Sequence, residues 1–276
     1  MRLNSKIVST IAMTFGASII GCAGQNNAQV TSSIKMTGTS SAASVVMNKR
    51  PSLWNMLLRT AYALVPASIV DSSGSVVTLS SAWVVIKELE FKSSETVGAE
   101  DDKSEIEFKG PYFVNLLSNV PVVLDTHLIT QKDIKRIKMN LESTQSVLPN
   151  GAPAGLANNS VYFAGTVGAN NFAFQLNDGT EIQIAGPNSF QPAANSQLLV
   201  EIQIANIFKQ INLSTVTNNE IISQSNRHPG VSLCPSIDPS AADLYSCLRK
   251  GLEAHANFGE DKDGDNILDH NDEHVK

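Results

Sequence analysis

Between residues 69 and 213, apolar side chains recur at every second position, and this period constrains the fold more than any other feature. Leu89 and Phe91, for example, alternate with Glu88 and Glu90. Because successive side chains of a strand point to opposite faces of its sheet, such a segment has one buried face and one wet face. The alternation and the apolar runs predict strands over residues 34–37, 83–91, 137–141, 161–167, 172–176, 181–185 and 198–204.

The segments between these strands are rich in Gly, Pro and Asn. The clearest signal is Asn177-Asp178-Gly179, which predicts a hairpin between its two flanking strands because glycine accepts a positive φ at no steric cost. Many short strands separated by such turns indicate an antiparallel β-sandwich of the Ig or prealbumin-like type. We therefore expect a mainly β chain, with the sandwich domain over residues 34–213.

Two helices are expected beside the strands. Residues 51–64 place apolar side chains at helical spacing after Pro51, which suits a first turn. Their apolar stripe should dock on the core rather than on lipid, because few basic residues accompany it. The second helix is expected to begin at Asp238, a good N-cap, followed by Pro239. Its apolar face consists of Leu244, Cys247, Leu248 and Leu252.

The N-terminus has the pattern of a signal peptide. Arg2 and Lys6 precede an uncharged, mostly apolar run over residues 7–20, which is shorter than the roughly 20 residues of a membrane-spanning helix. The run ends in Ile19-Ile20-Gly21-Cys22, which resembles the lipobox of bacterial lipoproteins. The alternative is a simple secretory peptide with a chance cysteine.

The lipobox resemblance implies that residues 1–21 are removed and that Cys22 carries lipid, including acyl chains such as palmitate. Several acyl chains would anchor the protein firmly, whereas one chain binds a membrane only marginally. Residues 22–33 would then be a lipidated tether. Ala23 replaces the aspartate that retains such lipoproteins in the inner membrane, so the resemblance favours the outer membrane of the cell envelope.

Charge and cysteine content restrict the partners of the mature chain. Without residues 1–21, the chain has 18 basic and 26 acidic residues, which argues against nucleic-acid binding. If Cys22 carries lipid, Cys234 and Cys247 remain, and an even pair in an oxidising compartment predicts a disulfide bond. A cysteine metal site lacks further ligands in this sequence. The bond would cross-link the region of residues 214–258, which consists of a linker and a helix.

The order of several strand segments resembles a β-sandwich domain of unknown function that is common in bacterial surface lipoproteins. The likeness covers roughly residues 30–213 and departs from that family at residues 130–133, where the family carries a Pro-Ala-Gly-x-Tyr turn. It implies a fold but no activity. The segments that carry it are residues 83–91, 114–117, 137–141 and 199–204.

The strongest chemical signal lies in the acidic residues 259–276. Carboxylates at positions 1, 3, 5, 9 and 12 of one loop can converge on a cation, while Gly264 allows tight winding. The pattern resembles a thrombospondin type 3 calcium repeat, and it departs from an EF-hand, which has glycine at position 6 and glutamate at position 12. The alternative is a disordered acidic tail, which we expect without metal. The predicted calcium ligands are Asp261, Asp263, Asp265, Ile267, Asp269 and Asp272.

Zinc chemistry is a weaker interpretation of the same segment. His270, Glu273 and His274 match the H-x-x-E-H pattern of one zinc metallopeptidase class. That pattern needs a helix to place both histidines on one face, and the neighbouring Asp and Asn residues disfavour a helix. His127 and His228 have no catalytic neighbour in the sequence, so we expect them to be surface or packed residues.

These observations predict a lipid-anchored envelope lipoprotein that is not an enzyme and that binds calcium. Its membrane contact would be the lipid on Cys22, and a protein or glycan ligand is expected as its partner. One alternative is a secreted hydrolase whose active-site residues converge from unremarkable positions. Another is a structural component of the envelope with no diffusible ligand. A carboxylate pair in a pocket, or a hydroxyl beside a histidine, would favour the hydrolase.

Overall fold

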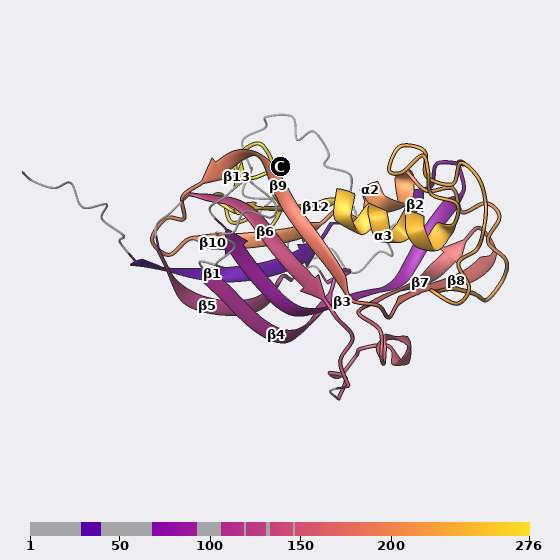
Figure 1. The fold of residues 1–276 in the computed structure, drawn as a ribbon, viewed down its shortest axis with the longest axis horizontal. Helices are drawn as coiled ribbons and strands as arrows, with labels where there is room; N and C mark the ends of the chain where they lie inside the picture. Colours follow the sequence, from indigo (N-terminus) through magenta and orange to yellow (C-terminus); the bar gives the residue numbers. More distant parts are fainter. Residues whose placement is uncertain (1–28, 40–67, 93–105, 119, 131–132, 146) are drawn as a thin grey trace, which may run out of the picture.

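The computed structural model of the chain describes residues 29–39, 68–92, 106–118, 120–130, 133–145 and 147–276 (Figure 1). The predicted signal peptide, Cys22 and the helix expected over residues 51–64 lie outside these ranges. Within the described ranges, no helix is both long enough and apolar enough to cross a membrane.

The prediction of a mainly β chain is confirmed, with two sheets of five and eight strands in the described part of the chain. The five-stranded sheet consists of β1 (Gln29–Gly38), β5 (Val122–Thr130), β10 (Gln197–Ile202), β12 (Ala256–Glu260) and β13 (Glu273–His274). The eight-stranded sheet consists of β2 (Ser68–Val70), β3 (Val76–Lys92), β4 (Ile106–Asn115), β6 (Ile134–Leu141), β7 (Val161–Val167), β8 (Asn170–Leu176), β9 (Thr180–Phe190) and β11 (Glu220–Ile222). Helical segments in the same ranges are η2 (Ala154–Leu156), α2 (Ile204–Lys209) and α3 (Leu244–Ala254).

Strand β3 joins the two halves of the molecule. Its first half pairs with β2 and β7, and its second half pairs with β4 and β6, with register shifts after Leu79 and after Ile86. Figure 1 shows β3 running from the half that contains β7, β8 and the helices to the half that contains β1 and β10. One long strand therefore contributes to both ends of the molecule.

Aromatic side chains connect the two sheets. Phe258 of β12 lies 5.1 Å from Phe91 of β3 and 5.2 Å from Phe190 of β9, measured between ring centroids. All three side chains are buried in one hydrophobic core, to which both sheets contribute. At the other end, Phe208 of α2 and Tyr245 of α3 pack against aromatic residues of β7 and β8.

The sheets are mixed, so the expectation of purely antiparallel pairing does not hold. The β1–β10 and β8–β11 pairs are parallel, while the other strand pairs of the described ranges are antiparallel. Parallel neighbours need a long crossover connection, and both pairs have one. The chain passes through strands β2 to β9 between β1 and β10, and through β9, β10 and α2 between β8 and β11.

The predicted hairpin at residues 177–179 is wrong. The chain turns there, but β8 pairs with β7 and β11, whereas β9 pairs with β6. Both edges of β8 are thus already occupied. Asp178 instead contacts α3, where its carboxylate accepts a hydrogen bond from the Tyr245 hydroxyl and lies 3.5 Å from the Arg249 guanidinium. The hairpin forms at Gly168, φ 57°, between β7 and β8.

The second predicted helix exists but begins later than expected. Asp238 caps a turn, since its Oδ1 accepts from the backbone N–H of Ser240 at 2.9 Å. The helix N-cap is Asp243, which accepts from Ser246 N at 2.7 Å. Asp243 itself is extended, with φ −158° and ψ 158°, and forms an isolated β-bridge with Pro229, so the helix begins only after it. The predicted disulfide joins Cys234 to Cys247, whose Cα atoms are 5.7 Å apart.

The boundary expected at residue 258 falls inside strand β12. That strand pairs with β10 along its whole length, from Ala256 opposite Ile202 to Glu260 opposite Leu198. Phe258 and Val275 are fully buried. The C-terminal segment thus supplies a strand and core side chains. An acidic loop follows strand β12 after Glu260.

Candidate metal centre

The acidic loop, residues 261–272, connects β12 to β13. The two strands form an antiparallel ladder in which Gly259 lies opposite His274 and Glu260 lies opposite Glu273. This ladder brings the ends of the loop together. Consequently, the spacing of the aspartates along the chain becomes an arrangement of carboxylates around one turn.

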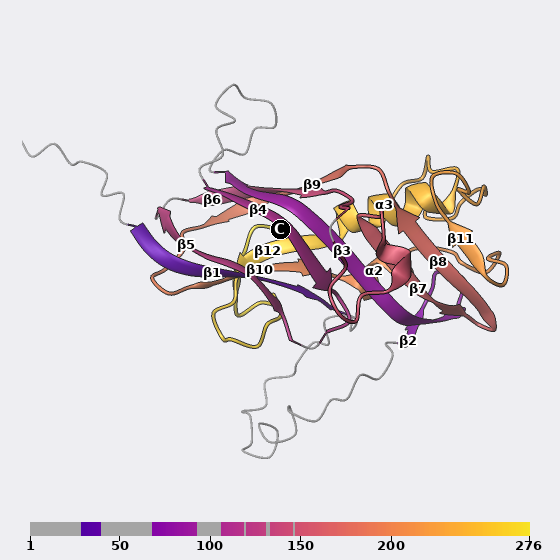
Figure 2. The same cartoon turned by 90° about the horizontal axis from the view of Figure 1, so that it is seen from below.

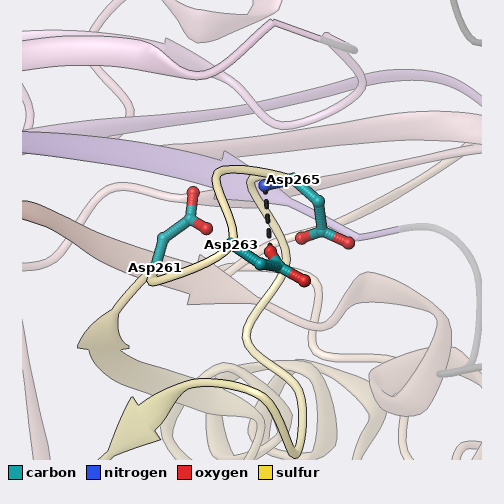
Figure 3. A group of neighbouring side chains, drawn as sticks. All are labelled: Asp261, Asp263 and Asp265. Atoms are coloured by element: carbon teal, nitrogen blue, oxygen red, sulfur yellow. Dashed lines mark hydrogen bonds between the residues drawn. The ribbon is translucent and has the colours of Figure 1, made fainter. Parts of the chain in front are cut away.

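Three of the predicted ligands converge. Ligand oxygens of Asp261, Asp263 and Asp265 all lie within 4.8 Å of one another (Figure 3). Within the described ranges, this is the one group of three or more acidic, histidine or cysteine side chains that is close enough to hold an ion. All its donors are carboxylate oxygens, which are the ligands of hard cations such as calcium and magnesium.

Asp261 also organises the turn. Its Oδ1 accepts from the backbone N–H of Gly264 at 2.7 Å, and its Oδ2 accepts from the N–H of Asn266 at 3.0 Å. Gly264 has φ 76°, a left-handed conformation that glycine adopts without strain. An ionised carboxylate has about four acceptor sites, so these two bonds leave capacity for a cation.

Asp272 closes the other side of the loop. Its Oδ1 accepts from Lys262 N at 2.8 Å, and its Oδ2 accepts from Asp269 N at 2.9 Å. The carboxylate is buried, with 9% of the residue exposed. Asp272 therefore ties the start of the loop to its end, and it lies outside the group of three converging carboxylates.

The remaining predicted ligands are also outside that group. Asp269 accepts from the backbone N–H of Asn271 at 2.8 Å, and Ile267 donates its N–H to Asp265 at 2.9 Å. The loop predicted from the sequence therefore contains three converging carboxylates, but not all of the predicted ligands belong to that group. All five aspartates accept hydrogen bonds from backbone amides of the loop, but only Asp261, Asp263 and Asp265 also converge on one point.

Burial and mutual repulsion shift the titration of the loop. The pKa of Asp261 is raised, first by burial and then by the charges of Asp272 and Asp263. The pKa of Asp265 is raised by burial and by the charges of Asp263, Asp261 and Asp269. A bound cation would offset this repulsion, because its charge favours the ionised carboxylates.

A further carboxylate, which the sequence pattern missed, lies beneath the loop. Glu201 of β10 has 1% of its surface exposed, and burial raises its pKa. It accepts hydrogen bonds from the Gln203 side chain at 3.0 Å and from the backbone of Leu268 in the acidic loop. One signal was available, since Glu201 is the single charge within the apolar strand Gln197–Ile202.

The geometry does not provide the helix that the zinc pattern needs. Glu273 and His274 form strand β13, while the His270 side chain is 72% exposed on the preceding turn. The two histidines therefore do not share a helix face. This arrangement agrees with the rejection of that pattern on sequence grounds.

The chain is thus a mainly β protein of two mixed sheets with an acidic loop that could hold a metal ion. No family model matches it, and neither the curated proteins nor the solved structures contain a significant match. Its function must therefore be argued from its own residues.

Proposed function

We propose that the acidic loop binds one calcium ion and that the protein is a lipid-anchored module of the bacterial cell envelope. The observation that carries the calcium part is the convergence of Asp261, Asp263 and Asp265. Calcium takes six to eight oxygen ligands in a flexible shell, so carboxylates, backbone carbonyls and water can share it. Magnesium fits less well, because it prefers a smaller octahedral shell and releases its water reluctantly.

Hydrogen bonds within the loop favour calcium binding, because they hold the turn in shape before an ion binds. The backbone amide bonds of Asp261 and Asp272 hold the turn in shape. Preorganised ligands cost less entropy on binding than ligands that must be ordered. Extracellular calcium modules commonly bind at about 10⁻⁴ to 10⁻³ M, a range that calcium outside cells reaches.

The anchor is proposed from the lipobox resemblance around Cys22. Lipid on this cysteine would hold the mature chain on the outer membrane. We infer that the two sheets form a sandwich that presents its loops to a protein or glycan partner. The support is a shared core with inter-sheet aromatic contacts, and the parallel β1–β10 pair distinguishes this arrangement from an all-antiparallel Ig-like one.

Calorimetry of the mature chain with millimolar calcium tests the metal site. The wild-type protein should bind calcium, while Asp263→Asn and Asp265→Asn should each weaken binding at least about tenfold, because each removes a charged ligand oxygen. The matched control is Asp133→Asn, which removes an exposed aspartate far from the loop in sequence. No heat from the wild-type protein, or equal binding by Asp263→Asn, would refute the calcium proposal.

The anchor has a separate test. Mass spectrometry of the mature N-terminus should find lipid on Cys22, and Cys22→Ser should leave an uncleaved or soluble product. Cys234→Ser serves as a control, because this cysteine belongs to the disulfide and should not affect lipidation. An unmodified Cys22 in the mature wild-type protein would refute the lipoprotein proposal.

A further inference from the structure

Three side chains form a hydrogen-bonded series beside strand β11, which begins at Glu220 and which Figure 2 shows next to β8 at one end of the molecule. The Glu220 carboxylate Oε1 lies 2.5 Å from Nδ1 of His228. The other ring nitrogen, Nε2, lies 3.0 Å from Oγ1 of Thr215. His228 is isolated in the sequence, but the fold gives it a carboxylate on one side and a hydroxyl on the other.

Elementary chemistry decides the direction of both bonds. An ionised carboxylate can only accept, so Nδ1 of His228 must carry the proton that faces Glu220. The pKa of Glu220 is lowered by hydrogen bonds from Thr217 and His228, despite the opposing effect of burial, which keeps this carboxyl ionised. In neutral imidazole, Nε2 is then an acceptor, and Thr215 must donate its hydroxyl proton to it. This is the tautomer that a general base requires.

Both Glu220 and His228 are held in place by their surroundings. Oε2 of Glu220 accepts from the backbone N–H of Thr217 at 2.8 Å and from its hydroxyl at 2.9 Å. The carbonyl of His228 accepts from Leu244 N at 3.1 Å, and its φ of 51° is unusual for a residue with a side chain. Backbone strain of this kind persists only where the surrounding structure enforces it.

The three hydrogen-bonded residues differ in their exposure to solvent. The side chains of Glu220 and His228 are only 10% and 13% exposed, whereas Thr215 is exposed. A reactant can therefore reach the hydroxyl while the carboxylate–imidazole pair stays sheltered from bulk water. Sheltering strengthens the interaction between the carboxylate and a developing imidazolium.

We propose that Thr215 is a nucleophile for acyl transfer, that His228 is its general base, and that the substrate is a carboxylic ester. Both of these residues would touch reacting atoms, and Glu220 is a positioning residue that sets the tautomer of His228. An ester suits the site because its leaving alkoxide can take back the proton that His228 has removed. The proposal gives the hydrolase alternative a defined site, and it is independent of the calcium loop.

The reaction balances with water as the second substrate. Oγ1 of Thr215 bonds to the ester carbonyl carbon as its proton passes to Nε2 of His228, and the leaving alcohol takes that proton when its C–O bond breaks. Water then gives a proton to Nε2 and its oxygen bonds to the acyl carbon. Thr215 leaves with the proton, and the products are one alcohol and one carboxylic acid.

Hydrolysis of p-nitrophenyl acetate by the mature chain tests the proposal. Thr215→Ala and His228→Ala should each lower kcat/KM at least about tenfold, since general base catalysis commonly contributes about 10²-fold or more. Thr215→Ser should retain activity because it keeps the hydroxyl. Glu220→Gln should lower kcat with little change in KM, as expected for a group that positions the base. The matched control is His270→Ala, which removes an exposed histidine.

Peptide mass spectrometry after acid quenching provides a second readout. It should find the acetyl group on Thr215 in the wild-type protein, on the replacement hydroxyl in the Thr215→Ser variant, and on neither hydroxyl in Thr215→Ala. Thermal unfolding checks that each variant remains folded. Equal rates for the wild-type protein and folded Thr215→Ala, or acetylation confined to lysines, would overturn the proposal.

Discussion

The buried carboxylate of Glu201, on β10, accepts a hydrogen bond from the backbone of Leu268 in the acidic loop. Strand β10 lies between β1 and β12, near the middle of the five-stranded sheet. The negative charge of Asp265 also raises the pKa of this carboxyl group. A loop that could hold a metal ion is thereby connected to a central strand of the fold.

Replacing Glu201 should separate its role as a hydrogen-bond acceptor from the effect of its buried charge. Glu201→Ala removes the acceptor for Leu268 and Gln203 and should lower the free energy of unfolding by about 1 to 3 kcal/mol, the usual cost of orphaned buried donors. Glu201→Gln keeps an acceptor oxygen and removes a buried charge, so it should be neutral or stabilising without calcium. Urea unfolding measures both, and equal destabilisation by the two variants would contradict this account.

Calcium affinity should fall on acidification at a higher pH than for ordinary aspartates. The pKa values of Asp261 and Asp265 are raised above 3.8, so protons compete with calcium over a pH range that begins above this value. Without calcium, acidification should have the opposite effect and stabilise the folded protein through these two carboxyl groups. A carboxyl whose pKa is higher in the folded state favours folding once protonated, so this contribution grows as pH falls through the raised pKa values.

Calorimetric calcium titrations from neutral pH down to about pH 4 check this dependence, because an ordinary aspartate, with a pKa of about 3.9, loses its charge only at the lower end of that range. Thermal unfolding of the calcium-free protein over the same pH range checks whether the contribution of these carboxyl groups to stability grows as the pH falls. Affinity that stays constant down to the ordinary aspartate range would contradict the raised pKa values.

Phe258→Ala should destabilise the whole protein. Its side chain is fully buried between Phe91 and Phe190, and a large-to-small change of this kind typically costs about 3 to 5 kcal/mol. A matched surface control is Val231→Ala, at a residue that is 88% exposed. Chemical unfolding followed by tryptophan fluorescence reports the effect. A loss below about 1 kcal/mol would mean that residues 256–276 are a dispensable tail.

Removal of the Cys234–Cys247 bond should lower the free energy of unfolding by about 3 kcal/mol, because the bond closes a loop with a sequence separation of 13 residues. The double variant Cys234→Ala/Cys247→Ala measures this loss, and reduction of the wild-type protein is the matched comparison. Amide exchange should increase first in α3. Unchanged stability after complete reduction would contradict the proposed role of the bond.

Some of the site was visible in the sequence and some was not. The spacing of Asp261, Asp263 and Asp265 identified the loop, because these residues are two positions apart within one turn of the chain. Glu201 and Thr215 were not recognised, because their partners are distant in sequence or lie in irregular segments. Local sequence carries no signal for contacts of that kind.

The period of the strands, the pair of cysteines left to form a disulfide and the acidic loop could all be predicted from the sequence. Strand β7, for instance, has the predicted bounds, Val161–Val167. Each of these features depends on residues that are close along the chain.

Only the tertiary structure decided which strands pair. Asn177-Asp178-Gly179 makes a turn, yet β8 and β9 separate because β7 and β11 occupy both edges of β8. Strand β12 joins β10, although the sequence places its end in an acidic tail. Pairing depends on which edges are open and on the apolar surface that each arrangement buries, and these are properties of the whole chain.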